Sequence, residues 1–253
     1  MAVLLERLSY ARSILITAPL VFITTAVMGT LSLLSSLFDS SGTAQHACAR
    51  WWARMVLAIC RVRLTVSGHV EFRENTPCVF FANHQSHIDI PVVLAALPIP
   101  FRFAAKKELF RIPFLGWHLR RSGHIAVDRQ NPHASVKSFR GATRKLSSGT
   151  SLVFFPEGAT SLDGRIKSFK SGGFVLARQS QADVVALTIR GTRAVLKPRT
   201  YHVKGGPVEV TFGHPVSSTG YPLRELVTVI HEDITTVFEN DKTLDRNTHS
   251  ISR

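Results

Sequence analysis

The chain has 253 residues, of which 45% are hydrophobic, so it is long enough to bury a core in one domain with an appendage. A short fragment stapled by disulfides and a disordered tail are therefore excluded. Its formal net charge of +14 favours an anionic partner, namely nucleic acid, an acidic carrier protein or a phospholipid surface. The three cysteines, Cys48, Cys60 and Cys78, fit neither a disulfide framework nor a paired zinc site, and we expect them to be structural thiols.

The N-terminal region contains a long stretch without a charged residue, residues 13–38. As one helix rising about 1.5 Å per residue, this stretch would exceed a hydrocarbon core of about 30 Å. Pro19 and Gly29 lie within it, so it could instead break into two shorter helices that enter one leaflet and return. We expect an uncleaved membrane anchor. A transmembrane span and a re-entrant hairpin both remain open, and the hairpin is slightly favoured.

Residues 45–64 combine tryptophan and arginine with an apolar side. Arg50, Arg54 and Arg61 share one helical face, which leaves an apolar face that would lie among lipid headgroups. An ordinary amphipathic helix packed on the following domain is the alternative. Together with the Lys and Arg bias around the apolar stretch, this predicts that residues 1–64 anchor the chain in the inner or cytoplasmic membrane, with the rest facing the cytoplasm.

From residue 65 onward, short β-branched or aromatic runs alternate with helical stretches, which is typical of an α/β domain. We expect a single domain over residues 65–240, built on a mixed sheet flanked by helices, and a polar C-terminal tail over 241–253. The expected strands are 63–68, 78–82, 101–105, 124–127, 151–155, 184–189 and 208–212. The expected helices are 91–97, 133–148, 172–179 and 222–240.

The sharpest local pattern follows the expected strand 78–82, where the apolar run ends in Asn83, His84 and further polar residues. Such strand ends are where α/β folds place reactive groups. With Asp89 near the start of the next helix, its carboxylate could bind one imidazole nitrogen of His84 and leave the other as a base. The alternative is that Asp89 only caps the helix and His84 is an ordinary loop histidine.

These residues form the pattern NHxxxxD, and here the chain resembles the glycerolipid acyltransferases that include the 1-acylglycerol-3-phosphate acyltransferases. Three further blocks resemble that family's motifs and follow in its order: GHIAVDR at 123–129, FPEGATS at 155–161, and residues 184–191. Residues 105–117 and 169–172 resemble its connecting segments. The resemblance covers residues 60–215, and the combination of blocks is far more specific than any one of them.

The resemblance implies acyl transfer in which His84 acts as general base and Asp89 orients it. The substrate-binding residues that it implies are Asn83, Lys106, Arg129, Glu157, Gly158, Thr160, Ser161 and Lys170. Among them, Arg129 would hold a substrate phosphate, and Glu157 would reach the acceptor's hydroxyl or hold a neighbouring loop. Backbone N–H groups around the first and third motifs would stabilise the tetrahedral oxyanion. Neither a metal nor another cofactor is implied.

The implied reaction moves a fatty acyl group from a thioester of coenzyme A or acyl carrier protein to 1-acylglycerol-3-phosphate, forming phosphatidic acid. Two departures from the family pattern bear on the acceptor. Thr160 stands where the family usually has arginine, and Ala186 where it usually has proline. The missing arginine would have bound phosphate through two hydrogen bonds, although Arg165, Lys167 or Lys170 could supply the charge. Another lysophospholipid or a lyso-aminolipid is therefore a rival acceptor.

The positive charge also allows a non-enzymatic interpretation, a basic scaffold that binds membrane or nucleic acid. The chain lacks a helix-turn-helix signature, RNA-recognition aromatics and a dense basic tract. The expected partners are therefore a phospholipid membrane, a lysophospholipid acceptor and the acyl thioester, without nucleic acid.

Overall fold

The computed structural model describes residues 2–68, 76–128 and 135–249, and in that part of the chain seven strands form one sheet in the order β1-β7-β6-β2-β5-β3-β4. All neighbouring strands are parallel except β6 and β7. The predicted mixed sheet is confirmed, and each expected strand is present. The bounds are β1 Val62–Gly68, β2 Cys78–Ala82, β3 Phe101–Lys106, β4 Ile125–Val127, β5 Ser151–Phe154, β6 Asp183–Arg190 and β7 Gly206–Phe212.

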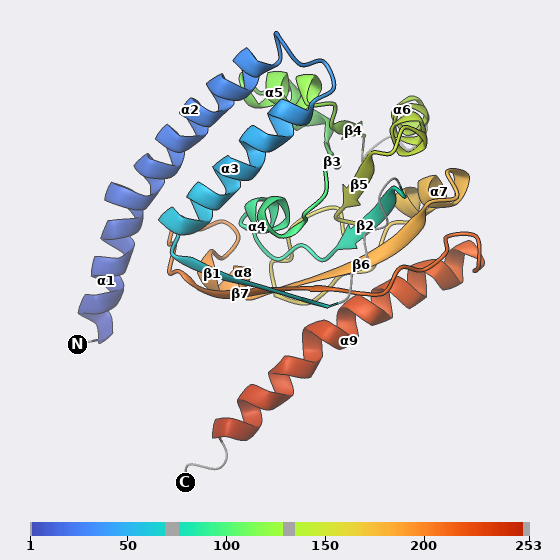
Figure 1. The fold of residues 1–253 in the computed structure, drawn as a ribbon. Helices are drawn as coiled ribbons and strands as arrows, with labels where there is room; N and C mark the ends of the chain where they lie inside the picture. The colour runs from blue at the N-terminus through green and yellow to red at the C-terminus, as the bar shows by residue number, and fades with distance from the viewer. Residues whose placement is uncertain (1, 69–75, 129–134, 250–253) are drawn as a thin grey trace.

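Helices cover both faces of the sheet and give the domain three layers (Figure 1). On one face lie α3 (Thr43–Ile59) and α4 (Asp89–Ala96), and on the other α6 (Ser135–Ser147), α7 (Gly172–Gln179) and α9 (Leu223–His249). Three short helices were not expected: η2 (Lys107–Arg111), α5 (Leu115–Arg121) and α8 (Thr192–Val195). The last helix continues past residue 240 to His249, so it enters the segment expected to be a polar tail.

The central strand β2 shows why the core has two halves. All five of its residues are buried, because a strand inside a covered parallel sheet packs on both faces. Successive side chains point to opposite faces, so Phe80 packs with α3 and α4 while Val79 and Phe81 pack with α7 and α9. Phe81 and Phe174 of α7 stack with their ring centroids 3.8 Å apart.

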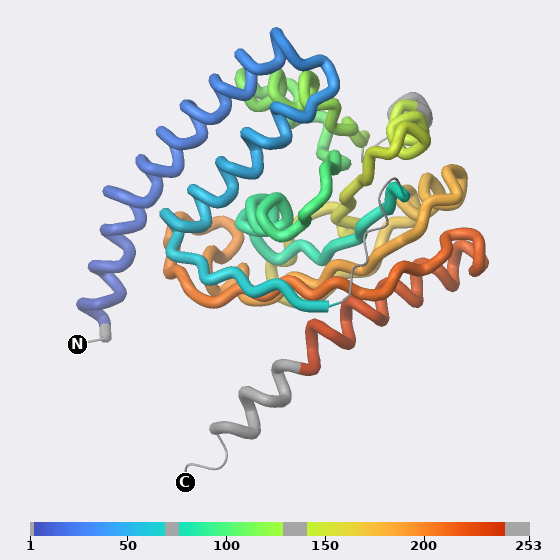
Figure 2. The backbone as a smooth tube through the Cα atoms, in the orientation of Figure 1, coloured from blue at the N-terminus to red at the C-terminus, as the bar shows by residue number. Residues whose placement is uncertain are grey.

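The apolar N-terminal stretch forms one continuous helix, made of α1 (Ala2–Arg12), a π-helical turn η1 (Ser13–Thr17) and α2 (Ala18–Ser35). The break considered at Pro19 does not occur: the chain stays helical through this proline, and the π-helical turn directly precedes α2. The helix is long and apolar enough to cross a membrane by length and composition. The chain then turns and returns as α3 (Figure 2).

Helix α3 packs on the domain, so the alternative of an ordinary packed amphipathic helix is the one that the structure supports. Its residues Ala53, Val56 and Leu57 belong to the same buried cluster as the sheet, which corrects the expectation that this face lies among headgroups. Because α2 lies along α3, the layers run from sheet to α3 to α2 (Figure 1). The division expected after residue 64 falls inside strand β1.

Candidate active site

The residues of the first and third motifs meet where β2 and β5 end. These strands are hydrogen-bonded neighbours and run parallel, so their carboxyl ends lie at the same edge of the sheet. His84 follows β2, and Glu157 follows β5. The ring of Phe155 stacks on that of His84 with centroids 4.3 Å apart. The first and third motifs therefore lie together at one edge of the sheet.

The side chains of His84 and Asp89 form a hydrogen bond, with Nδ1 and Oδ2 2.7 Å apart. Asp89 is fully buried and is the first residue of α4, so the pair straddles the junction between loop and helix. The same Oδ2 accepts the backbone N–H groups of Gln85 and Ser86, at 2.7 and 2.9 Å. Because this oxygen acts as an acceptor, the imidazole donates Nδ1–H to it and keeps the lone pair on Nε2.

The carboxylate of Glu157 binds two backbone segments. Its Oε1 accepts the N–H of His84 at 2.7 Å, and its Oε2 accepts the N–H of Lys167 at 3.0 Å. The side chain is buried, and burial raises its pKa above the ordinary value for glutamate. The N–H of Ser161 also donates to the carbonyl of His84, at 2.8 Å. Glu157 therefore holds a neighbouring loop, which is one of its two expected roles.

Asn83 and Ser161, for which substrate binding is expected from the sequence, lie inside the fold. The amide of Asn83 donates to the carbonyl of Ile189 at 2.8 Å and accepts its N–H at 2.7 Å, so it joins the ends of β2 and β6. The hydroxyl of Ser161 donates to Asp163 at 2.8 Å and accepts the N–H of Gly164 at 3.0 Å. Both side chains are fully buried and have their hydrogen bonds within the protein.

The other expected substrate-binding residues lie at the surface of this edge. Gly158 has a φ of +80°, which glycine adopts without strain, and the side chain of Lys170 passes beside it. The carbonyl of Thr160 accepts a hydrogen bond from Lys167 Nζ at 3.2 Å. Lys106, at the end of β3, is exposed and lies 3.7 Å from Glu108. Arg129 lies outside the described residues.

Two cavities adjoin Phe155 and its neighbours. The first has a volume of about 520 Å³ and is lined by Phe155, Pro156, Gly158 and Lys170 together with apolar strand residues and the start of α7. The second, of about 180 Å³, is an apolar pocket between α2, α3, α4 and α5. Its wall includes Phe103, whose ring centroid is 6.1 Å from that of Phe155. Phe155 therefore stands between His84 and the apolar pocket.

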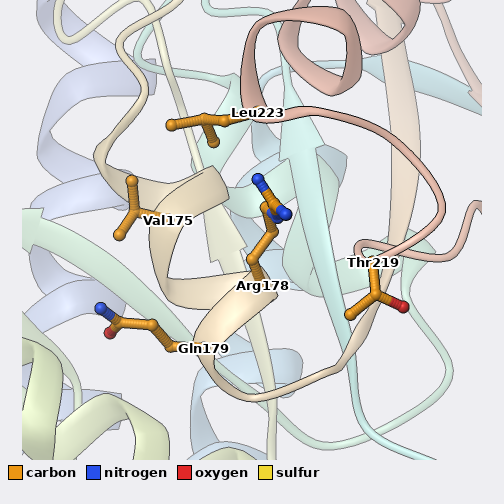
Figure 3. Close-up of a pocket in the computed structure, with 5 residues that line it drawn as sticks. All are labelled: Val175, Arg178, Gln179, Thr219 and Leu223. Atoms are coloured by element: carbon orange, nitrogen blue, oxygen red, sulfur yellow. The ribbon is translucent and has the colours of Figure 1, made fainter.

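A third hollow, of about 300 Å³, lies between the end of α7 and the start of α9 (Figure 3). It is lined by Val175, Arg178, Gln179, Thr219 and Leu223, and none of the motif residues contributes to it. This hollow is therefore separate from the candidate site around His84. Within the described part of the chain, no cluster of three or more His, Cys, Asp or Glu side chains is placed to hold a metal ion.

The sequence did not reveal Arg193, whose guanidinium binds the backbone of the third motif and of the residue after it. Its Nη1 donates to the carbonyl of Ser161 at 2.9 Å, and its Nη2 to that of Leu162 at 2.6 Å. Arg193 lies far along the chain in the short helix α8, and no spacing links it to the motif.

The backbone also limits where an oxyanion could be bound. The N–H groups of His84, Gln85, Ser86 and Ser161 already have acceptors within the protein. If backbone N–H groups around these motifs bind the oxyanion, as we expect, they are not these four.

Comparison with known proteins identifies the class of this site. The model of the acyltransferase family matches residues 63–190, and the chain belongs to that family. A 1-acyl-sn-glycerol-3-phosphate acyltransferase of Chlamydomonas reinhardtii is 34% identical over 192 residues, which are 74% of this chain and 55% of the relative. The corresponding chloroplastic enzyme of Arabidopsis thaliana is 38% identical over 152 residues, 60% of this chain and 42% of the relative. The chain thus spans about half the length of these curated relatives.

A solved structure is similar over nearly the whole chain. PlsC, the 1-acyl-sn-glycerophosphate (LPA) acyltransferase of Thermotoga maritima, matches with a TM-score of 0.79 at 25% identity, covering 92% of this chain and 98% of that one. The predicted family and fold class are confirmed: the chain belongs to the acyltransferase family and has a mixed α/β fold with an apolar N-terminal helix.

Proposed function

We propose that this enzyme transfers a fatty acyl group from a thioester to the free hydroxyl of 1-acylglycerol-3-phosphate and so forms phosphatidic acid. The observation that carries the proposal is the 2.7 Å hydrogen bond of His84 to the buried Asp89 where β2 ends. The ring of Phe155 stacks on that of His84, and Phe155 also lines the cavity that Lys170 borders. The relatives named above carry the same activity in their names, which supports this choice of acceptor.

In the proposed mechanism, Nε2 of His84 removes the proton from the acceptor hydroxyl as its oxygen attacks the thioester carbonyl carbon. Asp89 keeps the imidazole in the required tautomer and stabilises the imidazolium that forms. When the tetrahedral intermediate collapses, the carbon–sulfur bond breaks, and the imidazolium returns its proton to the leaving thiolate. The products are the diacylated lipid and the free thiol of coenzyme A or acyl carrier protein, with no acyl-enzyme.

We propose that Lys170, Lys167 and Arg129 recognise the acceptor's phosphate. Lys170 borders the cavity, and Arg129 follows Asp128, which lines it. Lys167 crosses the third motif at Thr160, where the family usually has arginine, and brings a positive charge to that loop. A lysine provides a point charge in place of a bidentate fork, so another lysophospholipid or a lyso-aminolipid is the second candidate acceptor.

The apolar pocket of about 180 Å³ is proposed to hold a fatty tail. It lies beyond Phe155, and its lining comes from both the domain and the N-terminal helix. Helix α2 would therefore contribute to substrate binding as well as to attachment. Gly29 faces this pocket with no atom within 4 Å of the position of a Cβ.

The N-terminal helix is proposed to lie in one leaflet, with the domain on the cytoplasmic side of the inner or cytoplasmic membrane. Three contacts along its length attach it to the rest of the chain. Arg12 donates to the carbonyl of Val203 at 2.6 Å, Trp52 donates to Thr25 at 3.0 Å, and Ser32 lies 2.7 Å from His118. A helix held in this way could cross the bilayer only by drawing the domain's polar surface into the hydrocarbon, which is costly. These contacts support a helix that lies in one leaflet over a transmembrane span, although it does not break into the two shorter helices expected of a re-entrant hairpin.

The proposed function is tested by thiol release from acyl-CoA and acyl carrier protein, with lysophosphatidate and a panel of other lysolipids as acceptors. The His84→Ala protein is the control for non-enzymatic hydrolysis. Release that depends on lysophosphatidate would support the leading acceptor and show that Thr160 is compatible with phosphate recognition. Release that depends on another lysolipid would make the altered third motif a change of specificity, and no release with any acceptor would overturn the proposal.

A further inference from the structure

We propose that the segment containing η2 and α5 is a second membrane contact, which inserts into an anionic phospholipid surface beside the N-terminal helix. The proposal rests on the membrane association of the proposed function and adds a lipid-binding site within the α/β domain itself. The exposed apolar residues that form this site, the α5 patch, are Leu109, Ile112, Phe114, Leu115 and Trp117.

The α5 patch exposes large side chains that a soluble surface would bury. Phe114 is 62% exposed and Trp117 is 48% exposed. Their rings contact each other, with centroids 5.1 Å apart, so together they form one apolar projection. Clustered exposed apolar side chains of this kind mark interaction sites, and tryptophan is favoured where hydrocarbon meets headgroups.

The backbone presents these rings in a fixed conformation. Phe114 has a φ of +61°, which is unfavourable for a residue with a Cβ and is maintained only where the surroundings demand it. Gly116 packs against Phe110 so closely that a Cβ would come within 2.1 Å of its carbonyl oxygen. The guanidinium of Arg120 donates to that same carbonyl. The turn between η2 and α5 is thus braced from two sides, by Gly116 and by Arg120.

The α5 patch continues the apolar face of the N-terminal helix. Ser32 of α2 contacts His118 of α5, and in Figure 1 the end of α2 lies beside α5. Leu31 and Leu34, near the same end of α2, are also exposed. Because the two apolar surfaces adjoin, one bilayer surface would contact both.

Charge selects a lipid surface over an apolar protein partner. Arg111 and Arg121 are exposed on either side of the α5 patch, and the whole chain carries a net charge of +14. Arginine flanking exposed tryptophan and phenylalanine is the composition of segments that lie in anionic membrane interfaces. Trp117 and Arg121 are four residues apart in α5, so this helix presents both on one side.

The test measures partition of the full-length protein onto vesicles of phosphatidylcholine with phosphatidylglycerol, in the absence of substrate. Phe114→Ser with Trp117→Ser should weaken partition about tenfold or more, since each ring buried in lipid contributes more than the 1.4 kcal/mol of a tenfold change. Tyr221→Ser is the matched control, because Tyr221 is an exposed aromatic residue outside the α5 patch. Unchanged partition of the double variant would overturn the proposal.

A second measurement reads the position of Trp117 directly. The chain has three tryptophans, so Trp51→Phe with Trp52→Phe leaves Trp117 as the sole reporter. On vesicles containing brominated phospholipid, its emission should shift to shorter wavelength and be quenched. Bound protein with an unshifted, unquenched Trp117 would contradict the proposal. His84→Ala should bind vesicles normally, so these results do not depend on whether the acyl-transfer proposal is correct.

Discussion

The backbone N–H of His84 donates to the buried carboxylate of Glu157 at 2.7 Å, so the third motif sets the position of the first. The other oxygen of that carboxylate accepts the N–H of Lys167, from the loop that carries a positive charge to Thr160. One buried side chain therefore ties the proposed base to the loop proposed to bind phosphate.

Glu157→Gln should lower kcat more than it raises KM for the acceptor. Glutamine has one acceptor oxygen for two N–H donors, and leaving a buried N–H of His84 or Lys167 unpaired costs about 1 to 3 kcal/mol. A displaced His84 would reduce turnover by about tenfold or more through that cost. Steady-state kinetics with the acceptor varied would separate the two parameters. A rise in KM alone would instead place Glu157 on the acceptor's hydroxyl.

His84→Ala should reduce turnover by about 10² to 10⁴, the range attributed to general-base catalysis. Membrane binding should be unchanged, because His84 lies at the sheet edge and its hydrogen bonds are to Asp89 and Glu157 of the α/β domain. Single-turnover thiol release and vesicle sedimentation, run on the same preparation, would check both statements. A nearly active variant would reject His84 as the base.

Asp89→Asn should also impair turnover while the protein stays folded. The amide oxygen can still accept the N–H groups of Gln85 and Ser86, but a neutral side chain no longer stabilises the imidazolium of His84. The loss should therefore appear in kcat. Circular dichroism and thermal unfolding of Asp89→Asn would exclude a folding defect, and undiminished kcat would show that Asp89 only caps α4.

The sequence predicts the strands well because each is a short apolar run between breaks, as residues 78–82 show. It also predicts the contact of His84 with Asp89, since the distance is short along the chain and a strand end precedes it. It does not predict the hydrogen bonds of Asn83 and Ser161 within the protein. The partner of Asn83, Ile189, is remote along the chain, and that of Ser161, Asp163, is placed by a turn. A motif shows which residues recur together, and only the fold shows which of them face the cavity.

Helix α3 shows the same limit at the level of a whole element. Its amphipathic pattern fits a headgroup surface and a protein surface equally well, and the decision lies in what the sheet leaves uncovered. Ala53, Val56 and Leu57 fill that space. Removal of residues 1–64 would therefore expose the core as well as remove the membrane helix.

Gly29→Leu should shorten the acyl chain that the enzyme prefers. A Cβ at Gly29 meets no atom within 4 Å, so the larger side chain enters the apolar pocket without a clash with the backbone. Replacement of a helical glycine also stabilises the helix by about 0.5 to 1 kcal/mol. We expect competition between acyl-CoA donors of graded length to shift toward shorter chains, with kcat for a short donor retained. Unchanged chain preference would show that the fatty tail lies elsewhere.

Buried histidines beneath the turn between α2 and α3 should make the fold less stable in acid. Burial lowers the pKa of His46 and of His118 to about 4, with the positive charge of Arg102 adding to the effect. Between that value and the ordinary histidine pKa of about 6.5, the unfolded chain binds more protons than the folded one, so the free energy of unfolding falls as the pH falls. Each histidine contributes a slope of at most about 1.4 kcal/mol per pH unit in this window.

Thermal unfolding measured from pH 7 down to pH 4.5 should show a falling Tm, and His118→Gln should reduce the slope because glutamine does not titrate. The glutamine amide can replace the contact of His118 with Ser32 without a change of charge. An identical slope in that variant would therefore mean that other groups govern the acid sensitivity.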